Sequence, residues 1–129
     1  NGGIIYPASH YGRDALVGIA LFLTHLAKEN KTMSILKASY PSYHISKNKI
    51  ELTPEIDVDK ILSSIEKKYS NYPINKIDGV KIDFDEEWVH LRKSNTEPII
   101  RIYTESVSAN TASNLANKII SDIKEIIKS

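Results

Sequence analysis

The chain has 129 residues, which is enough for one compact domain and part of another. Hydrophobic residues make up 41% of it and charged residues 26%, proportions typical of a globular protein, and the net charge of +1 gives no reason to expect a nucleic-acid partner. Because the sequence has no cysteine, disulfides and thiolate metal sites are excluded, and we expect a cytoplasmic protein.

We expect no membrane partner, because no apolar run reaches the roughly 20 residues that a membrane-spanning helix needs. The closest candidate, residues 15–27, is too short and is interrupted by Gly18, Thr24 and His25. The chain opens on Asn1-Gly2-Gly3, with neither an initiator methionine nor a signal-like segment, which suggests a piece of a longer protein.

The first 40 residues contain one strongly apolar segment. Residues 13–29 follow a helical pattern in which the polar side chains share one narrow stripe. Because such a helix is normally buried, we interpret residues 1–40 as the truncated helical end of an α/β domain. The alternative is the central helix of a small bundle. In the isolated chain this helix should recruit cover from another copy, so we expect either self-association through residues 13–29 or poor order in the first 40 residues.

A second domain is predicted over residues 41–129. Thr32 can cap a short helix that ends near Ala38, and Tyr40-Pro41-Ser42 then breaks the chain at our preferred boundary. Alternating and helical hydrophobic patterns follow in turn. They predict strands over 43–52, 80–85, 88–92 and 99–105, a lead-in over 74–77, and helices over 57–69 and 108–128.

This order of elements, β-α-β-β-β-α, predicts an α+β fold for the second domain. We expect an antiparallel sheet of about four strands with two helices packed on one face. The first strand is weakened in its middle by Lys47, Asn48 and Lys49.

Residues 88–103 carry the chemistry that we consider most informative. Two strands meet at a loop that contains Ser94, Asn95 and Thr96, with Arg92 before it and Arg101 after it. If the apolar residues of both strands face the helices, the period of two puts both arginines on the open face. Two guanidinium groups would then flank one short polar loop.

Such a loop suits a phosphate monoester, whose dianion needs donors from several directions. Arginine supplies paired donors and keeps its charge, and Ser94 and Thr96 add hydroxyls. A tight turn at Asn95 would point backbone N–H groups inward as an anion nest, and asparagine tolerates the left-handed conformation that such a turn can need. The alternative is an ordinary hairpin loop beside two surface arginines, and the carboxylate of Glu97 favours that alternative mildly.

The motif Arg92-Lys93-Ser94-Asn95-Thr96-Glu97-Pro98, with Arg101 after it, resembles the phosphate-binding signature in the last domain of the α-D-phosphohexomutases. A second similarity lies in Asn1-Gly2-Gly3 and Gly12-Arg13-Asp14-Ala15, which look like the end of that family's third domain. Asp78-Gly79-Val80 and the strand of Trp88 also lie where the family has similar residues. The resemblance covers essentially the whole chain.

The resemblance implies a four-domain isomerase that interconverts hexose 1-phosphate and hexose 6-phosphate. Phosphate is transferred from an active-site phosphoserine through a bisphosphorylated sugar, with Mg²⁺ held by an aspartate-rich loop. Residues 1–40 would be the end of the third, sugar-recognition domain. Residues 41–129 would be the fourth domain, with a TATA-binding-protein-like fold, which grips the phosphate that is not reacting.

Carried over to this chain, the resemblance assigns the substrate phosphate to Arg92, Ser94, Asn95, Thr96 and Arg101. The phosphoserine and metal loops match nothing here, so we expect no catalytic or metal-binding residue, no bound cofactor and no activity of the chain alone. Asn1, Gly2 and Gly3 would be the remnant of the sugar loop, where the family typically has Ser-Gly-His. Gly3 cannot transfer a proton, which puts a histidine acid or base at that position in doubt.

The competing hypothesis is a stand-alone phosphosugar- or anion-binding module without catalysis. The partners we expect are a hexose phosphate substrate and the missing N-terminal domains of the same protein. Which hexose phosphate is used is not specified by these residues, since the family reads the sugar mainly with its third-domain loop.

Overall fold

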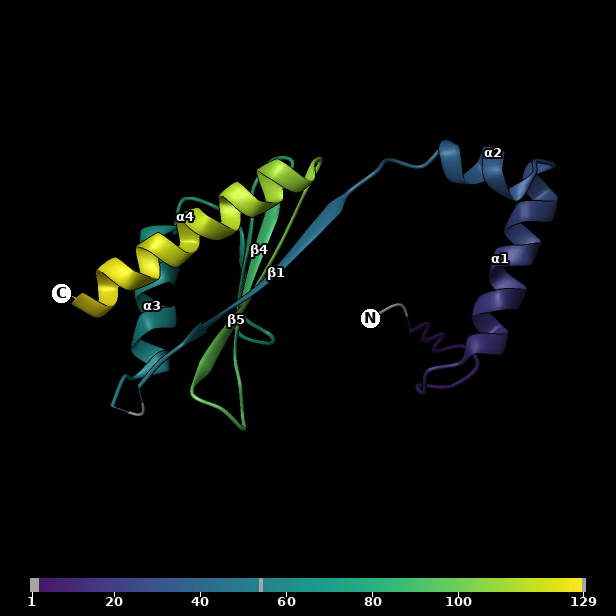
Figure 1. The fold of residues 1–129 in the computed structure, drawn as a ribbon. Coiled ribbons are helices and arrows are strands. Elements are labelled where there is room, and N and C mark those ends of the chain that lie inside the picture. Colours follow the sequence, from purple (N-terminus) through teal and green to yellow (C-terminus); the bar gives the residue numbers. More distant parts are fainter. Residues whose placement is uncertain (1–2, 54, 129) are drawn as a thin grey trace. The chain divides into compact units, whose positions relative to one another are not determined.

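The structure is a computed structural model that describes residues 3–53 and 55–128. It contains two compact units, Asn1–Pro41 and Ser42–Ser129, and each is described by itself (Figure 1). In the described ranges, no helix is long and apolar enough to cross a membrane.

The first unit is a pair of helices, α1 (Ala15–Glu29) and α2 (Met33–Ala38). Asp14 caps α1, because its side chain accepts a hydrogen bond from the Val17 N–H at 3.0 Å, and Thr32 caps α2 in the same way. The helix predicted over 13–29 is therefore confirmed, with its first residues serving as the cap. None of the described residues of α1 is buried, and Leu16 is 78% exposed.

The second unit is built on one antiparallel sheet of five strands, in the order β1-β5-β4-β3-β2. The strands are β1 (His44–Glu51), β2 (Ile74–Asn75), β3 (Val80–Asp83), β4 (Trp88–Lys93) and β5 (Ile99–Ser106). The predicted α+β class is confirmed. The strand beyond the predicted four is the two-residue β2, formed where the lead-in segment pairs with β3.

Strand β1 runs unbroken through the segment 47–49 that the sequence analysis expected to weaken it. Lys47 and Lys49 lie on its exposed side, while Ser46 and Asn48 lie on the more buried side. Asn48 donates to the Ser46 hydroxyl at 2.9 Å, so its amide has a local partner. The polar residues therefore fit the strand, because the lysines alternate onto its exposed side and Ser46 and Asn48 onto its more buried side.

Two helices, α3 (Val58–Lys68) and α4 (Ala109–Lys128), cover one face of this sheet, as predicted. Their apolar stripes and alternate strand residues form a single core. Fully or nearly buried members include Ile65 of α3, Ile119 and Ile123 of α4, and Leu91 and Ile102 of the sheet. The opposite face of the sheet carries the polar residues of the same strands, and we call it the open face.

Candidate functional site

The pairing of β4 with β5 brings the two predicted arginines together. Arg92 lies directly opposite Arg101 in the register of these strands. Both side chains are exposed, whereas Leu91 and Ile102, the next pair along, are fully buried. The prediction that both arginines project from the open face is therefore confirmed by the register and by the burial pattern.

Arg92 is held by a turn that the sequence analysis did not connect with the site. Its Nε lies 3.3 Å from the Asp78 carboxylate, and the Nε2–H of His90 donates to the Asp78 carbonyl oxygen. Asp78 therefore contacts two residues on the open side of β4 at once. Because the carboxylate engages Nε, the terminal nitrogens of Arg92 are left available as donors for a ligand.

Gly79 makes this approach possible. It has φ of +79°, and a Cβ added there would lie 2.2 Å from the Leu91 carbonyl oxygen. Only glycine fits such a close approach in the left-handed region. The sequence signal that could have indicated the contact is the Asp-Gly pair before β3, which we had interpreted only through its resemblance to the family.

The loop between the two arginines is open to solvent. Residues 95–98 are exposed and Ser94 is half-buried. Ser94 N–H donates to the Ile99 carbonyl at 3.1 Å, and Thr96 N–H donates to the Ser94 hydroxyl at 3.4 Å. The hydroxyls of Ser94 and Thr96 lie 3.5 Å apart. Two small polar groups are therefore side by side in the loop that connects the strands of the two arginines.

Asn95 does not adopt the left-handed conformation that a tight turn there could have used. In the described part of the chain, the one non-glycine residue with positive φ is Asn30. Asn95 therefore has a negative φ. An anion nest of backbone N–H groups at Asn95 therefore loses its basis. The amide side chain is the group through which Asn95 could contact a ligand.

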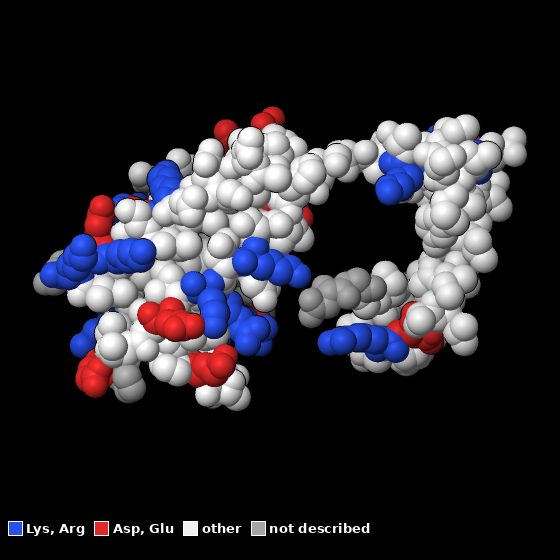
Figure 2. All heavy atoms as spheres, viewed as in Figure 1, with Lys and Arg blue, Asp and Glu red and all other residues white. Residues whose placement is uncertain are grey.

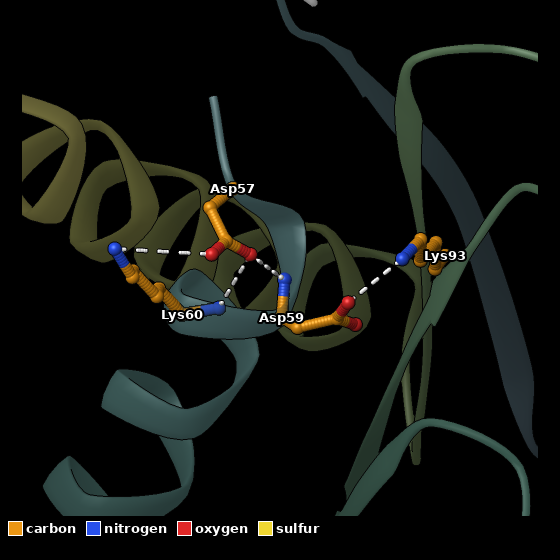
Figure 3. Close-up of polar contacts among 4 residues, drawn as sticks. All are labelled: Asp57, Asp59, Lys60 and Lys93. Atoms are coloured by element: carbon orange, nitrogen blue, oxygen red, sulfur yellow. Dashed lines mark hydrogen bonds and ion pairs between the residues drawn. The ribbon is translucent and has the colours of Figure 1, made fainter. Parts of the chain in front are cut away.

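Lys93, although part of the same motif, points away from the open face. Its Nζ lies 2.8 Å from the Asp59 carboxylate in the first turn of α3 (Figure 3). Asp57 caps that helix by accepting from the N–H groups of Asp59 and Lys60. Lys93 therefore ties the end of β4 to α3, a structural role, while Arg92 beside it faces outward.

The aromatic residues of the open face have partners within the protein. Trp88 donates to Glu105 at 2.9 Å, and the Lys81 ammonium lies 5.2 Å from the centre of its ring. The Lys47 ammonium lies 5.7 Å from the centre of the Tyr103 ring, which places a further cation over the strand that carries Arg101.

Comparisons with known proteins show the family to which the chain belongs. A family model described as "Phosphoglucomutase/phosphomannomutase, C-terminal domain" matches residues 49–121, more than half of the chain. The chain belongs to this family.

Relatives in the phosphoglucomutase/phosphomannomutase family match nearly all of the chain. A phosphoglucosamine/phosphogalactosamine mutase from Sulfurisphaera tokodaii is 41% identical over 130 residues, covering 99% of this chain and 28% of the relative. A phosphoglucomutase/phosphomannomutase from Thermococcus kodakarensis is 38% identical over the same shares. The chain therefore spans less than a third of the length of these relatives.

The fold is shared with a solved member of the family. The crystal structure of a phosphoglucomutase/phosphomannomutase family protein from Burkholderia thailandensis superposes with a TM-score of 0.67 at 20% identity. The match covers 96% of this chain and 26% of that one. This likeness supports the fold, including the predicted TATA-binding-protein-like architecture of the second unit.

Two other expectations from the family resemblance concern residues away from the loop. Asn1 and Gly2 of the sugar-loop remnant lie outside the described residues, and Gly3 lies against the side chain of Arg13 in the first unit.

Within 3–53 and 55–128, no three His, Asp or Glu side chains gather as metal ligands.

Proposed function

We propose that this chain is the C-terminal part of a phosphohexomutase and that its second unit binds the substrate phosphate that is not reacting. In this proposal the whole enzyme is an isomerase that interconverts hexose 1-phosphate and hexose 6-phosphate through a bisphosphorylated sugar. The phosphoserine and the Mg²⁺-binding loop belong to other parts of that enzyme. The chain alone binds without turnover.

The observation that carries the proposal is the cross-strand pairing of Arg92 with Arg101. Like charges at directly opposed strand positions destabilise a sheet. The pairing of two arginines on the open face therefore needs an explanation. A phosphate dianion between them would turn mutual repulsion into two attractive contacts. No ion pair of the Arg101 guanidinium occurs among the described residues, so this side chain is available to a ligand.

The loop supplies the remaining contacts. Ser94 and Thr96 offer hydroxyls that can donate to phosphate oxygens, and Asn95 offers an amide. Guanidinium groups form paired, charge-assisted hydrogen bonds with phosphate, which are stronger than neutral ones. Contacts to a phosphate remote from the reacting bond position the sugar and so contribute to catalysis elsewhere in the enzyme.

The test is a titration of the chain with glucose 6-phosphate at low salt, followed by amide NMR shifts. Arg92→Ala should weaken binding by about tenfold or more, as expected for the loss of one charge-assisted contact. Lys124→Ala is the matched control, because it removes one exposed cation from α4, which covers the other face of the sheet. Unphosphorylated glucose should produce no shifts.

Equal affinities for the unchanged chain and Arg92→Ala would contradict the proposed site. So would equal losses in Arg92→Ala and Lys124→Ala, because such a result would indicate general electrostatic attraction and no defined contact.

A further inference from the structure

Strand β1 adds a third cation to the row formed by Arg92 and Arg101. Lys49 lies directly opposite Arg101, on the side away from Arg92, so the three residues occupy consecutive strands at one level of the sheet. All three are exposed. Figure 2 shows Lys and Arg side chains gathered over the second unit where β1 and β5 run beside each other.

A shallow pocket joins Lys49 to the phosphate-binding loop. Its lining includes Lys47 and Lys49 of β1, Arg101 and Tyr103 of β5, and Glu97 of the loop itself. The pocket therefore continues from the loop across β5 to the edge strand. Three of its seven lining residues are cationic and one, Glu97, is anionic, so the lining carries a net positive charge that favours an anionic ligand.

The Lys49 ammonium lies within electrostatic reach of both the loop and the arginine. Its ion pair with Glu51, at 2.9 Å, raises the pKa of Lys49; Glu97 raises it further, and Arg101 lowers it. Lys49 therefore stays charged, and its charge interacts with Arg101 before any ligand binds.

The pairing with Glu51 is suited to exchange. The two side chains are 60% and 75% exposed, so their ion pair is largely screened by solvent and contributes little to stability. Both residues lie on β1, two positions apart, and the four-carbon stem of lysine allows the ammonium to turn from Glu51 toward the pocket. A phosphate dianion is a stronger partner than one exposed carboxylate.

We propose that Lys49 is a third phosphate-binding cation. Its ammonium breaks the ion pair with Glu51 and contacts the phosphate of the substrate together with Arg92 and Arg101. This inference rests on the proposed function, because it extends the same site onto the edge strand. It also gives the polar middle of β1 a role that is independent of strand formation.

The experiment measures the affinity of the chain for glucose 6-phosphate at low salt in four variants. Lys49→Gln should bind about fivefold more weakly than the unchanged chain, and Lys49→Arg within about twofold of it, because the charge is kept. Glu51→Gln should bind about twofold more tightly, because the competing carboxylate is gone. Lys124→Gln, the matched loss of a cation on α4, should leave the affinity unchanged.

The opposite responses of Lys49→Gln and Glu51→Gln separate binding from folding, since a structural ion pair would give both variants the same sign. Equal affinities for Lys49→Gln and Lys124→Gln, with binding still lost in Arg92→Ala, would overturn the role of Lys49 alone. No difference between Arg92→Ala and the unchanged chain would overturn the proposed function, and the inference with it.

Discussion

At the scale of single residues, the placement of Arg92 beside Asp78 depends on one glycine. Gly79 lets the Asp78 turn approach the backbone of β4, and Asp78 in turn holds the Nε side of Arg92. At the proposed phosphate site, a guanidinium oriented in this way before binding would lower the entropy that binding must overcome.

We predict that Gly79→Ala lowers the free energy of unfolding by about 2–4 kcal/mol. The left-handed φ of +79° and the 2.2 Å approach of the new Cβ to the Leu91 carbonyl both oppose the substitution. Urea unfolding followed by circular dichroism measures the change.

Asp78→Ala is the control for this prediction. It removes an exposed ion pair beside the same glycine and should cost less than about 1 kcal/mol. Similar stabilities for Gly79→Ala and Asp78→Ala would show that the turn tolerates a side chain and that the close approach is unimportant.

The sequence was sufficient to predict which face of the sheet a side chain lies on, because successive side chains of a strand alternate between its two faces. The alternation of apolar and charged residues was sufficient to put Arg92 and Arg101 on one face, because each strand has one buried side. It failed where a contact joins distant segments: Asp78 meets Arg92 only through the pairing of β3 with β4. It also failed at Asn95, where residue preference does not fix φ.

At the scale of elements, α3 and α4 are joined by a buried carboxylate. Asp122 of α4 is 8% exposed and accepts hydrogen bonds from Lys68 at 2.7 Å and from Tyr69 at 2.6 Å. Burial acts to raise the pKa of Asp122, but the hydrogen bonds from Lys68 and Tyr69 outweigh it and lower the pKa below its usual 3.8. Burial and the bond to Asp122 raise the pKa of Tyr69, which keeps its hydroxyl a donor.

We predict that Asp122→Asn lowers the free energy of unfolding by about 1–3 kcal/mol at neutral pH. A folded-state pKa below the unfolded value means that the stabilisation is complete above 3.8 and is lost as pH falls through the folded value. The difference between the two proteins should therefore shrink at about pH 3. Urea unfolding at both pH values measures it.

Glu125→Gln is the control for Asp122→Asn, since Glu125 is 71% exposed and lies 3.9 Å from the same Lys68 ammonium. Its substitution should change stability by less than about 0.5 kcal/mol. A difference between Asp122→Asn and the unchanged chain that stays constant with pH would contradict the ionised network.

Most elements could be predicted because each has a strong period and a clear end signal. Thr32 caps α2 as expected, and α3 begins after Asp57, the first residue of the helix predicted over 57–69. Asp14, which caps α1, lies inside the helix predicted over 13–29. The short β2 was missed because two residues give no period and because it exists only by pairing with β3. The strength of β1 was underestimated because its lysines were judged without knowing which side they face.

At the scale of the whole molecule, the two units differ in how completely they bury their apolar residues. The second has a continuous core of sheet and helix residues. In the first, Leu16, Ile19 and Leu23 of α1 are 78%, 54% and 52% exposed. An apolar surface of this kind normally marks a contact with other protein.

We predict that the chain self-associates in solution through α1. Sedimentation velocity at increasing concentration should show oligomers, and a double substitution of Leu16→Glu and Leu23→Glu should shift the population toward monomer. Met33→Glu, an exposed apolar residue of α2, is the control and should have a smaller effect. A monomer at all concentrations would refute self-association.

The assignment of residues 1–40 to the end of a larger domain stays a prediction. The apolar pattern of residues 13–29 was sufficient to predict a helix that needs cover. It carried no information on which surface supplies that cover, because periodicity describes one helix and not its partner.

The most direct test of the account is a map of amide shift changes when glucose 6-phosphate is added to the chain. The largest changes should fall on residues 92–96 and 101, at the adjoining ends of β4 and β5, and should disappear in Arg92→Ala. Changes concentrated on α3, α4 or the first unit, or no changes at low salt, would contradict phosphate binding at the paired arginines.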